Sequence, residues 1–169
     1  MEKCIQLGLV HNIGVSNFNI EQITRLLNSA KVRPTVNQIE CNVYMNQKKL
    51  VSFCQHKQIV VIAYAPFGSP ERPGHCSDNA QFLLVDHRLY HIAERYNKTI
   101  AQVALKYLLQ RGLVVIPKSS NNERIEENAD IFNFELTSKE MCQIDKYNLN
   151  ERAFKFIEAK SHRDYPFEK

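Results

Sequence analysis

Four short apolar runs, each followed by a helical pattern, predict an α/β fold built on a parallel sheet. The runs are rich in Val and Ile and are bounded by Gly, Pro or Asn, as buried parallel strands are. We expect strands at His11–Val15, Thr35–Glu40, Val60–Tyr64 and Val114–Ile116.

The first two connections each predict one helix, capped at its start by Asn19 and by Asn46; the second helix covers Gln47–Lys57. Apolar residues recur at helical spacing in both. The predicted inward positions are Ile20, Ile23, Leu26 and Leu27 in the first helix and Leu50, Val51 and Cys54 in the second.

The third connection is longer and contains the loop Pro66–Asn79, followed by two predicted helices. They cover Asp86–Tyr96 and, behind a Thr99 cap, Ile100–Gln110, with Gly112 where a helix end needs a positive φ. A helix near Asn122–Asp130 follows the last strand. A capping box opening at Thr137 then begins a short helix to Lys146, and the tail Asn148–Lys169 is expected to wrap over the body.

No Gly-x-Gly-x-x-Gly follows any strand, which argues against a Rossmann domain. A (β/α)₈ TIM barrel fits better, but a complete one takes about 250 residues. We therefore predict a single domain over residues 1–169 that corresponds to roughly the last four βα units plus the C-terminal helix and tail. The outer strands would be open edges and an inward Val and Ile layer would face water, which favours self-association of the half-barrel.

Composition excludes several classes of protein. The longest apolar run, Ile59–Ala65, is far shorter than the ~20 residues of a membrane helix, and the N-terminus has no secretory signal. Five cysteines without a CxxC pair indicate a reducing compartment, here the cytoplasm. The net charge of +4 is spread among acidic residues, which argues against nucleic-acid binding.

Metal and thiol chemistry are weakly indicated. His87 and His91 are spaced for one helix face, but no carboxylate completes a His-Glu-x-x-His pattern, so an exposed pair is favoured. The neighbours Cys54 and His56, like His75-Cys76, have no third group to support catalysis. Cys41 is interpreted as a buried apolar residue.

The segment from Val114 to Arg124 gives the strongest local signal. A strand ends, Lys118, Ser119 and Ser120 follow, and a helix begins with Arg124 in its first turns. Cations at a helix N-terminus cost about 0.3–1 kcal/mol each unless an anion is present, so this loop suits a phosphate. The alternative is that Glu123, Glu126 and Glu127 offset the two cations on a solvated face; this segment alone does not decide between them.

Polar residues at the other strand ends favour a ligand. Ser16 and Asn17 end the first strand, Gln38 lies in the second, and Tyr64 closes the third. The carboxyl ends of parallel barrel strands open on one face, where barrel enzymes place their chemistry. Asn17 as a residue preceding a helix cap, and Tyr64 as a core residue, remain the structural alternatives.

Four motifs follow one another along the chain: Gly14–Phe18, Asn37–Cys41, Ala63–Ser69 and Ile116–Ser119. Together with the ending Asp164–Phe167, they resemble the motifs of the aldo-keto reductase family in the same order, most closely those of the animal aldose and aldehyde reductases. The resemblance covers essentially the whole chain and implies NADPH-dependent reduction of aldehydes or ketones to alcohols.

The resemblance also implies roles by position. Ser16, Asn17 and Gln38 would hold the nicotinamide carboxamide, and Tyr64 would stack on its ring. The other implied cofactor contacts are Phe67 and Ser69 at the pyrophosphate, Lys118, Ser119 and Arg124 at the 2′-phosphate, and Glu127 and Asn128 at the adenine. The tail from Asn148 and the loop Pro70–Ser77 would shape preference for a small carbonyl substrate.

Two departures from the family pattern are minor: Ala65 stands where many relatives have Ser, and Ser120 where Val or Ala is common. The serious departure is that no motif matches the catalytic Asp, Tyr, Lys and His of the family's first half-barrel. We therefore expect no significant reduction by this chain alone. It is either an incomplete copy of a working oxidoreductase or a short, non-catalytic isoform that binds NADP weakly or pairs with another chain.

Overall fold

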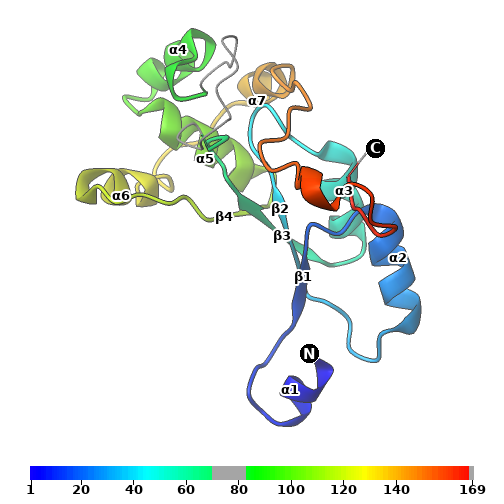
Figure 1. Cartoon of the computed structure of the whole chain (residues 1–169). Helices are drawn as coiled ribbons and strands as arrows, with labels where there is room; N and C mark the ends of the chain where they lie inside the picture. Colours follow the sequence, from blue (N-terminus) through cyan, green and yellow to red (C-terminus); the bar gives the residue numbers. More distant parts are fainter. Residues whose placement is uncertain (70–82, 168–169) are drawn as a thin grey trace. The chain divides into compact units, whose positions relative to one another are not determined.

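The computed structural model describes residues 1–69 and 83–167, which form strands alternating with helices (Figure 1). The strands are β1 (Gly14–Ser16), β2 (Val36–Glu40), β3 (Val60–Tyr64) and β4 (Val114–Val115). The α-helices are α1 (Glu2–Gln6), α2 (Ile20–Ser29), α3 (Lys48–His56), α4 (His87–Arg95), α5 (Ile100–Gln110), α6 (Asn122–Ala129) and α7 (Ser138–Asp145). Two short 3₁₀ helices, η1 (Leu83–Val85) and η2 (Ile157–Ala159), complete the order.

The four strands form one sheet in the order β1-β2-β3-β4, which confirms the predicted parallel α/β class. The register of β1 against β2 is parallel and pairs Gly14 with Val36 and Ser16 with Gln38. The predicted range of β3 holds, whereas β2 begins one residue later, at Val36, and β4 ends one residue earlier, at Val115. Strand β1 begins at Gly14 and extends through Ser16. Ser16 is therefore part of the ladder rather than a residue after it.

The chain groups into two compact units, and β2 and β3 pass from the first into the second. Unit 1 contains residues 1–39, 47–62 and 154–167, and its buried side chains include Ile23, Ile39, Val51, Cys54 and Val61. Unit 2 contains residues 40–46, 63–69 and 83–153, with a core that includes Leu89, Ile92, Leu105, Tyr107 and Ile144. That residues 1–169 form a single domain stays a prediction.

One face of the strands is much more exposed than the other. Val61 and Ala63 of β3 are buried, while Val60, one position before them, is 47% exposed. At and just after β4, Val114 is 45% and Ile116 43% exposed. Successive strand residues point to opposite faces, so Val60 lies on the less buried face of β3. That this face is the inward layer of a half-barrel stays a prediction.

The predicted helix N-caps are confirmed where the capping side chain and its N–H partner are close in sequence. Asn19, Thr99 and Thr137 each cap a helix, and all three form complete capping boxes. Gly112 follows α5 with the expected positive φ of 79°. The segment Asp86–Tyr96 is helical over His87–Arg95, with Asp86 as its cap.

Three details of the predicted helices were wrong. Gln47, at a φ of 49°, precedes α3 and makes no side-chain cap, whereas Asn46 is buried and its N–H donates to the side chain of Asn148. Ile20 is 39% exposed because it is the first residue of α2 and lies beyond the packed turn of Ile23. Leu50 is only half-buried, since Val51 and Cys54 take the inner face of α3.

The tail packs on the chain in two parts. Residues 148–153 belong to unit 2, where the N–H of Leu149 donates to the carbonyl of Tyr44. Residues 154–167 belong to unit 1, where Asp164 pairs with Arg25 of α2 at 2.7 Å and accepts at its carbonyl from Gln22. Among the residues that the structure describes, none lies in a helix long and apolar enough to cross a membrane.

Candidate functional site

In unit 1, the polar ends of β1 and β2 lie side by side. The hydroxyl of Ser16 donates to the carbonyl of Gln38 at 3.0 Å, and the Asn17 N–H donates to the same oxygen at 2.9 Å. Asn17 has a φ of 59°, a left-handed conformation that Asn tolerates better than most residues. The ladder thus brings together three predicted carboxamide contacts: Ser16, Asn17 and Gln38.

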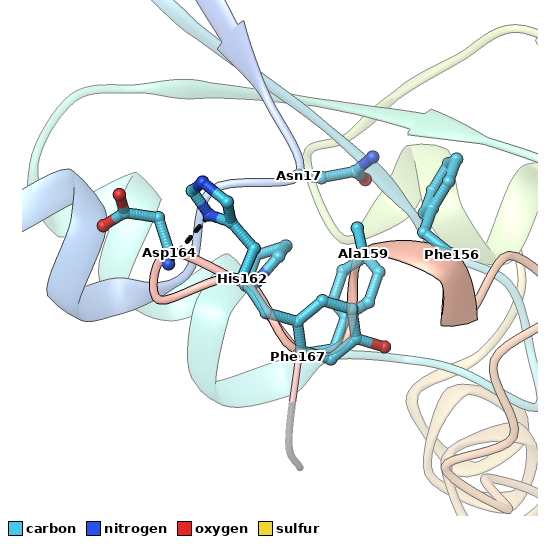
Figure 2. A pocket seen from close by; sticks show the side chains of 8 residues that line it. Asn17, Phe156, Ala159, His162, Asp164 and Phe167 are labelled. Atoms are coloured by element: carbon cyan, nitrogen blue, oxygen red, sulfur yellow. Dashed lines mark hydrogen bonds between the residues drawn. The ribbon is translucent and has the colours of Figure 1, made fainter.

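Asn17 also lines a shallow pocket of about 260 Å³ formed with the tail (Figure 2). The other lining residues are Phe156, Ala159, His162, Asp164, Tyr165, Pro166 and Phe167. Figure 2 shows the Asn17 carboxamide directed toward the side of the pocket that Phe156 occupies. The rings of Phe156 and Phe167 stack at 6.2 Å, so the walls of this pocket are largely aromatic.

In unit 2, Tyr64 ends β3 and a tight turn follows it. The Gly68 N–H donates to the carbonyl of Ala65 at 2.9 Å, and Ala65, Gly68 and Ser69 all have positive φ. This turn presents Phe67 and Ser69, both half-buried, directly after the strand end. The predicted loop residues Pro70–Ser77 lie outside the described residues, as does the His75-Cys76 pair.

Helix α6 follows β4 closely, and its start is built by the predicted phosphate loop. Asn121 is the helix cap and accepts from the Arg124 N–H at 2.9 Å. The Ser119 hydroxyl accepts from the Asn121 N–H at 3.1 Å and so orders the loop itself. Lys118 and Arg124 are exposed at this helix start.

The charges at this helix start are not offset by ion pairs. Among residues 1–69 and 83–167, no ion pair within 4.0 Å includes Lys118 or Arg124. Glu123 lies in the first turn and Glu127 is exposed further along, but neither pairs with the two cations. That this helix start binds an anion stays a prediction. Asn128, the other predicted adenine contact, is half-buried on the same helix.

The sequence analysis missed the buried carboxylate of Glu40 as a distinct feature. Its side chain is fully buried at the end of β2, lies 3.8 Å from Arg152 and accepts from the Ala153 N–H at 2.6 Å. A glutamate within an apolar strand indicates that a cation or hydrogen-bond donors lie beside it, because a buried charge without such partners is unfavourable. The next residue, Cys41, is buried as predicted, and burial raises the pKa of its thiol to about 11.

Metal and thiol sites gain no support from the geometry. His87 and His91 are both exposed on α4, and the described part of the chain holds no cluster of three His, Cys, Asp or Glu that could bind a metal. His56 is exposed and its Nδ1 lies 2.7 Å from the carbonyl of Ser52 within α3, whereas Cys54 is buried.

The fold and site define an α/β protein with a parallel sheet, polar strand ends and a helix start after β4 that carries two exposed cations, Lys118 and Arg124. The family model for the aldo/keto reductase family matches residues 1–149, and the chain belongs to this family. It is 47% identical over 169 residues to rat aldo-keto reductase family 1 member C15, and 44% identical to mouse aldo-keto reductase family 1 member D1. These alignments cover 99% of this chain and 52% of each relative, so the chain spans about half their length.

Solved structures agree. An aldo-keto reductase crystallised with NADPH, AKR2E5, is 40% identical and superposes with a TM-score of 0.93 over 99% of this chain and 51% of its own. A Bombyx mori aldo-keto reductase in complex with NADP is 41% identical, with a TM-score of 0.89 over 99% and 54%. The aldose reductase of Schistosoma japonicum gives 41% identity and 0.90 over 100% and 52%.

Proposed function

We propose that this chain supplies the NADPH/NADP⁺-binding part of an oxidoreductase that reduces small aldehydes or ketones to alcohols. Membership of the aldo-keto reductase family supports the reaction class. The two solved relatives bound to NADPH and NADP support the cofactor. The single observation that carries the proposal is the start of α6, where Lys118 and Arg124 stand without a carboxylate partner among the described residues.

The residues present suit the two ends of a dinucleotide. The positive end of a helix dipole and two cations suit a phosphate, here the 2′-phosphate, with Ser119 beside them. Paired amide and hydroxyl groups suit a carboxamide. The proposed nicotinamide contacts are Ser16, Asn17, Gln38 and Tyr64, the pyrophosphate contacts Phe67 and Ser69, and the adenine contacts Glu127 and Asn128. The bound cofactor supplies the hydride.

Proton donation to the carbonyl oxygen is proposed to come from elsewhere. The expected Asp, Tyr, Lys and His belong to a first half-barrel that no motif here matches, so the 169-residue chain is proposed to bind cofactor without reducing substrate. The tail beside Asn17 is proposed to contribute to substrate preference, because its aromatic rings form the pocket wall. We place the protein in the cytoplasm, the compartment that its scattered cysteines indicate.

The second candidate is a non-catalytic protein that pairs with another half-barrel or with itself. The exposure of Val60, Val114 and Ile116 favours it, because an uncovered β-face of this kind is stabilised by a partner. The two candidates differ in one measurable respect: only the first requires the cofactor site to discriminate for the 2′-phosphate.

Titration of NADPH fluorescence tests the cofactor site. The double variant Lys118→Ala with Arg124→Ala should weaken binding by about 100-fold, since two charge-assisted contacts to the 2′-phosphate are lost. The matched control is Lys48→Ala with Lys49→Ala, which removes two exposed cations from the first turn of α3. Binding that survives the first double variant unchanged would refute the 2′-phosphate assignment.

The proposed activity is tested by joining this chain to the first half of a relative. The 169-residue chain should show no NADPH-linked reduction of an aldehyde, and joining it to the first half of the 47% identical rat relative should restore the reaction. The same fusion with Lys118→Ala and Arg124→Ala should raise the KM for NADPH more than that for NADH. Turnover by the short chain alone would show that its proposed dependence on another half-barrel is wrong.

A further inference from the structure

Helix α6 carries Arg124, Glu127 and Asn128 of the proposed cofactor site, yet none of its residues is buried. Apolar packing along the helix therefore contributes little to its position. In Figure 1, α6 follows β4 through an extended stretch of chain. Side chains from outside α6 form hydrogen bonds with it at its carboxyl end.

The side chain of Gln102 makes these contacts. Its amide nitrogen donates to the carbonyl of Glu127 at 3.1 Å and to the carbonyl of Asp130 at 3.0 Å. Its amide oxygen accepts from the Thr99 N–H at 2.9 Å, which closes the capping box of α5. Gln102 is 4% exposed. One buried amide thus joins the start of α5 to the end of α6.

Lys98 adds a second donor to the same end of α6. Its ammonium lies 2.6 Å from the carboxylate of Asp130 and 3.3 Å from the Asp130 carbonyl. The last carbonyls of a helix have no partner within the helix and carry partial negative charge. Lys98 and Gln102 therefore hold the end of α6 by satisfying carbonyl oxygens there.

The residue type at position 102 is informative. A capping box needs only an acceptor at this position, and α7 uses a glutamate, Glu140, for the purpose. A glutamate at position 102 would close the box equally well, but only a carboxamide both accepts and donates. The amide hydrogens serve α6 rather than the helix that contains Gln102.

We infer that Gln102 is a positioning residue of the cofactor site, which sets the place of Arg124 by anchoring α6 at its opposite end. The inference rests on the proposed function, because it assigns Gln102 to recognition of the 2′-phosphate. Gln102 is buried on α5 and is not one of the proposed cofactor contacts. Its effect reaches the nucleotide through the two carbonyls of α6 and the rigid turns between them and Arg124.

The test measures binding of 2′,5′-ADP and 5′-ADP by calorimetry, since these nucleotides differ only in the 2′-phosphate. The wild-type chain should prefer 2′,5′-ADP. Gln102→Glu keeps the capping-box acceptor but sets a carboxylate against two carbonyl oxygens. The preference for 2′,5′-ADP should then fall about tenfold, as the loss of two hydrogen bonds implies.

The matched control is Gln22→Glu in the capping box of α2. Gln22 also uses its amide hydrogens on another segment, donating to the Asp164 carbonyl at 2.7 Å. Both variants should lower the Tm, but Gln22→Glu should leave the preference ratio unchanged. Lys98→Met, which removes the second donor and spares the capping box, should lower the ratio and serves if Gln102→Glu does not fold.

The outcomes separate the two proposals. If the wild-type chain does not distinguish the two nucleotides, the 2′-phosphate site itself is wrong. If it does, and both Gln102→Glu and Lys98→Met retain the wild-type ratio, then α6 is positioned by other contacts and the role inferred for Gln102 is overturned.

Discussion

The backbone N–H of Ala153 donates a 2.6 Å hydrogen bond to the carboxylate of Glu40, although 113 positions separate the two residues. The same carboxylate lies 3.8 Å from the guanidinium of Arg152, and Glu40 is fully buried. Glu40 ends β2, two residues beyond Gln38. Within unit 2, the buried carboxylate of Glu40 therefore holds residues 152 and 153 of the tail at the end of β2.

Removing this charge should be costly. We expect Glu40→Gln to lower the free energy of unfolding by about 2–4 kcal/mol, because it removes the carboxylate charge that lies 3.8 Å from the largely buried guanidinium of Arg152. Urea unfolding followed by circular dichroism measures the change. Glu126→Gln, at an exposed position of α6, should change stability by less than about 0.5 kcal/mol. Equal effects of the two variants would show that the Glu40–Arg152 pair contributes nothing.

Acid sensitivity should depend on Glu140. Burial opposes ionisation of this carboxyl, but hydrogen bonds from Tyr96 and Thr137, with the charge of Arg95, outweigh burial and lower its pKa. A carboxyl whose folded pKa lies below its unfolded value stabilises the protein above the unfolded pKa, and this stability is lost as the pH falls through the folded value. Glu140→Gln should therefore destabilise the chain at pH 7, and the difference should shrink below about pH 4.5.

Urea unfolding at several pH values between 7 and 3 measures this effect. The exposed Glu135→Gln variant is the control and should follow the wild-type pH dependence. A constant difference between wild type and Glu140→Gln down to pH 3 would contradict the lowered pKa.

Exposed cysteine thiols should react faster than buried ones in the native chain. In a background with Cys4→Ser and Cys76→Ser, Cys142 is the exposed cysteine among the described residues and should react with Ellman's reagent in the native state. Cys41 and Cys54 are buried, burial raises the pKa of both thiols, and they should react only after denaturation. Cys142→Ser should abolish the fast phase. Rapid labelling of Cys41 in the native chain would mean that its surroundings open readily.

Features that depend on residues close in sequence, such as helix caps, could be predicted from the sequence. Contacts between residues far apart in sequence could not. Thr99 caps α5 as predicted, because a cap and its N–H partner are three residues apart. Asn46 looked like a cap, but it is held by Asn148, 102 positions away, and no local pattern reveals that contact. The start of α6 was predictable because two cations at a helix start are unusual. The contacts of Gln102 with α6 were not, because a capping box uses only the acceptor side of the amide.

Val60 and Val61 offer a test of how the exposed strand face behaves in solution. They are adjacent in β3, with Val61 buried and Val60 47% exposed. If this face is open to water, Val61→Ala should lower the free energy of unfolding by about 2 kcal/mol and Val60→Ala by less than about 0.5 kcal/mol. Sedimentation and urea unfolding at several protein concentrations separate this result from association. If a second copy or another half-barrel covers the face, Val60→Ala should cost as much as Val61→Ala, and stability should rise with protein concentration.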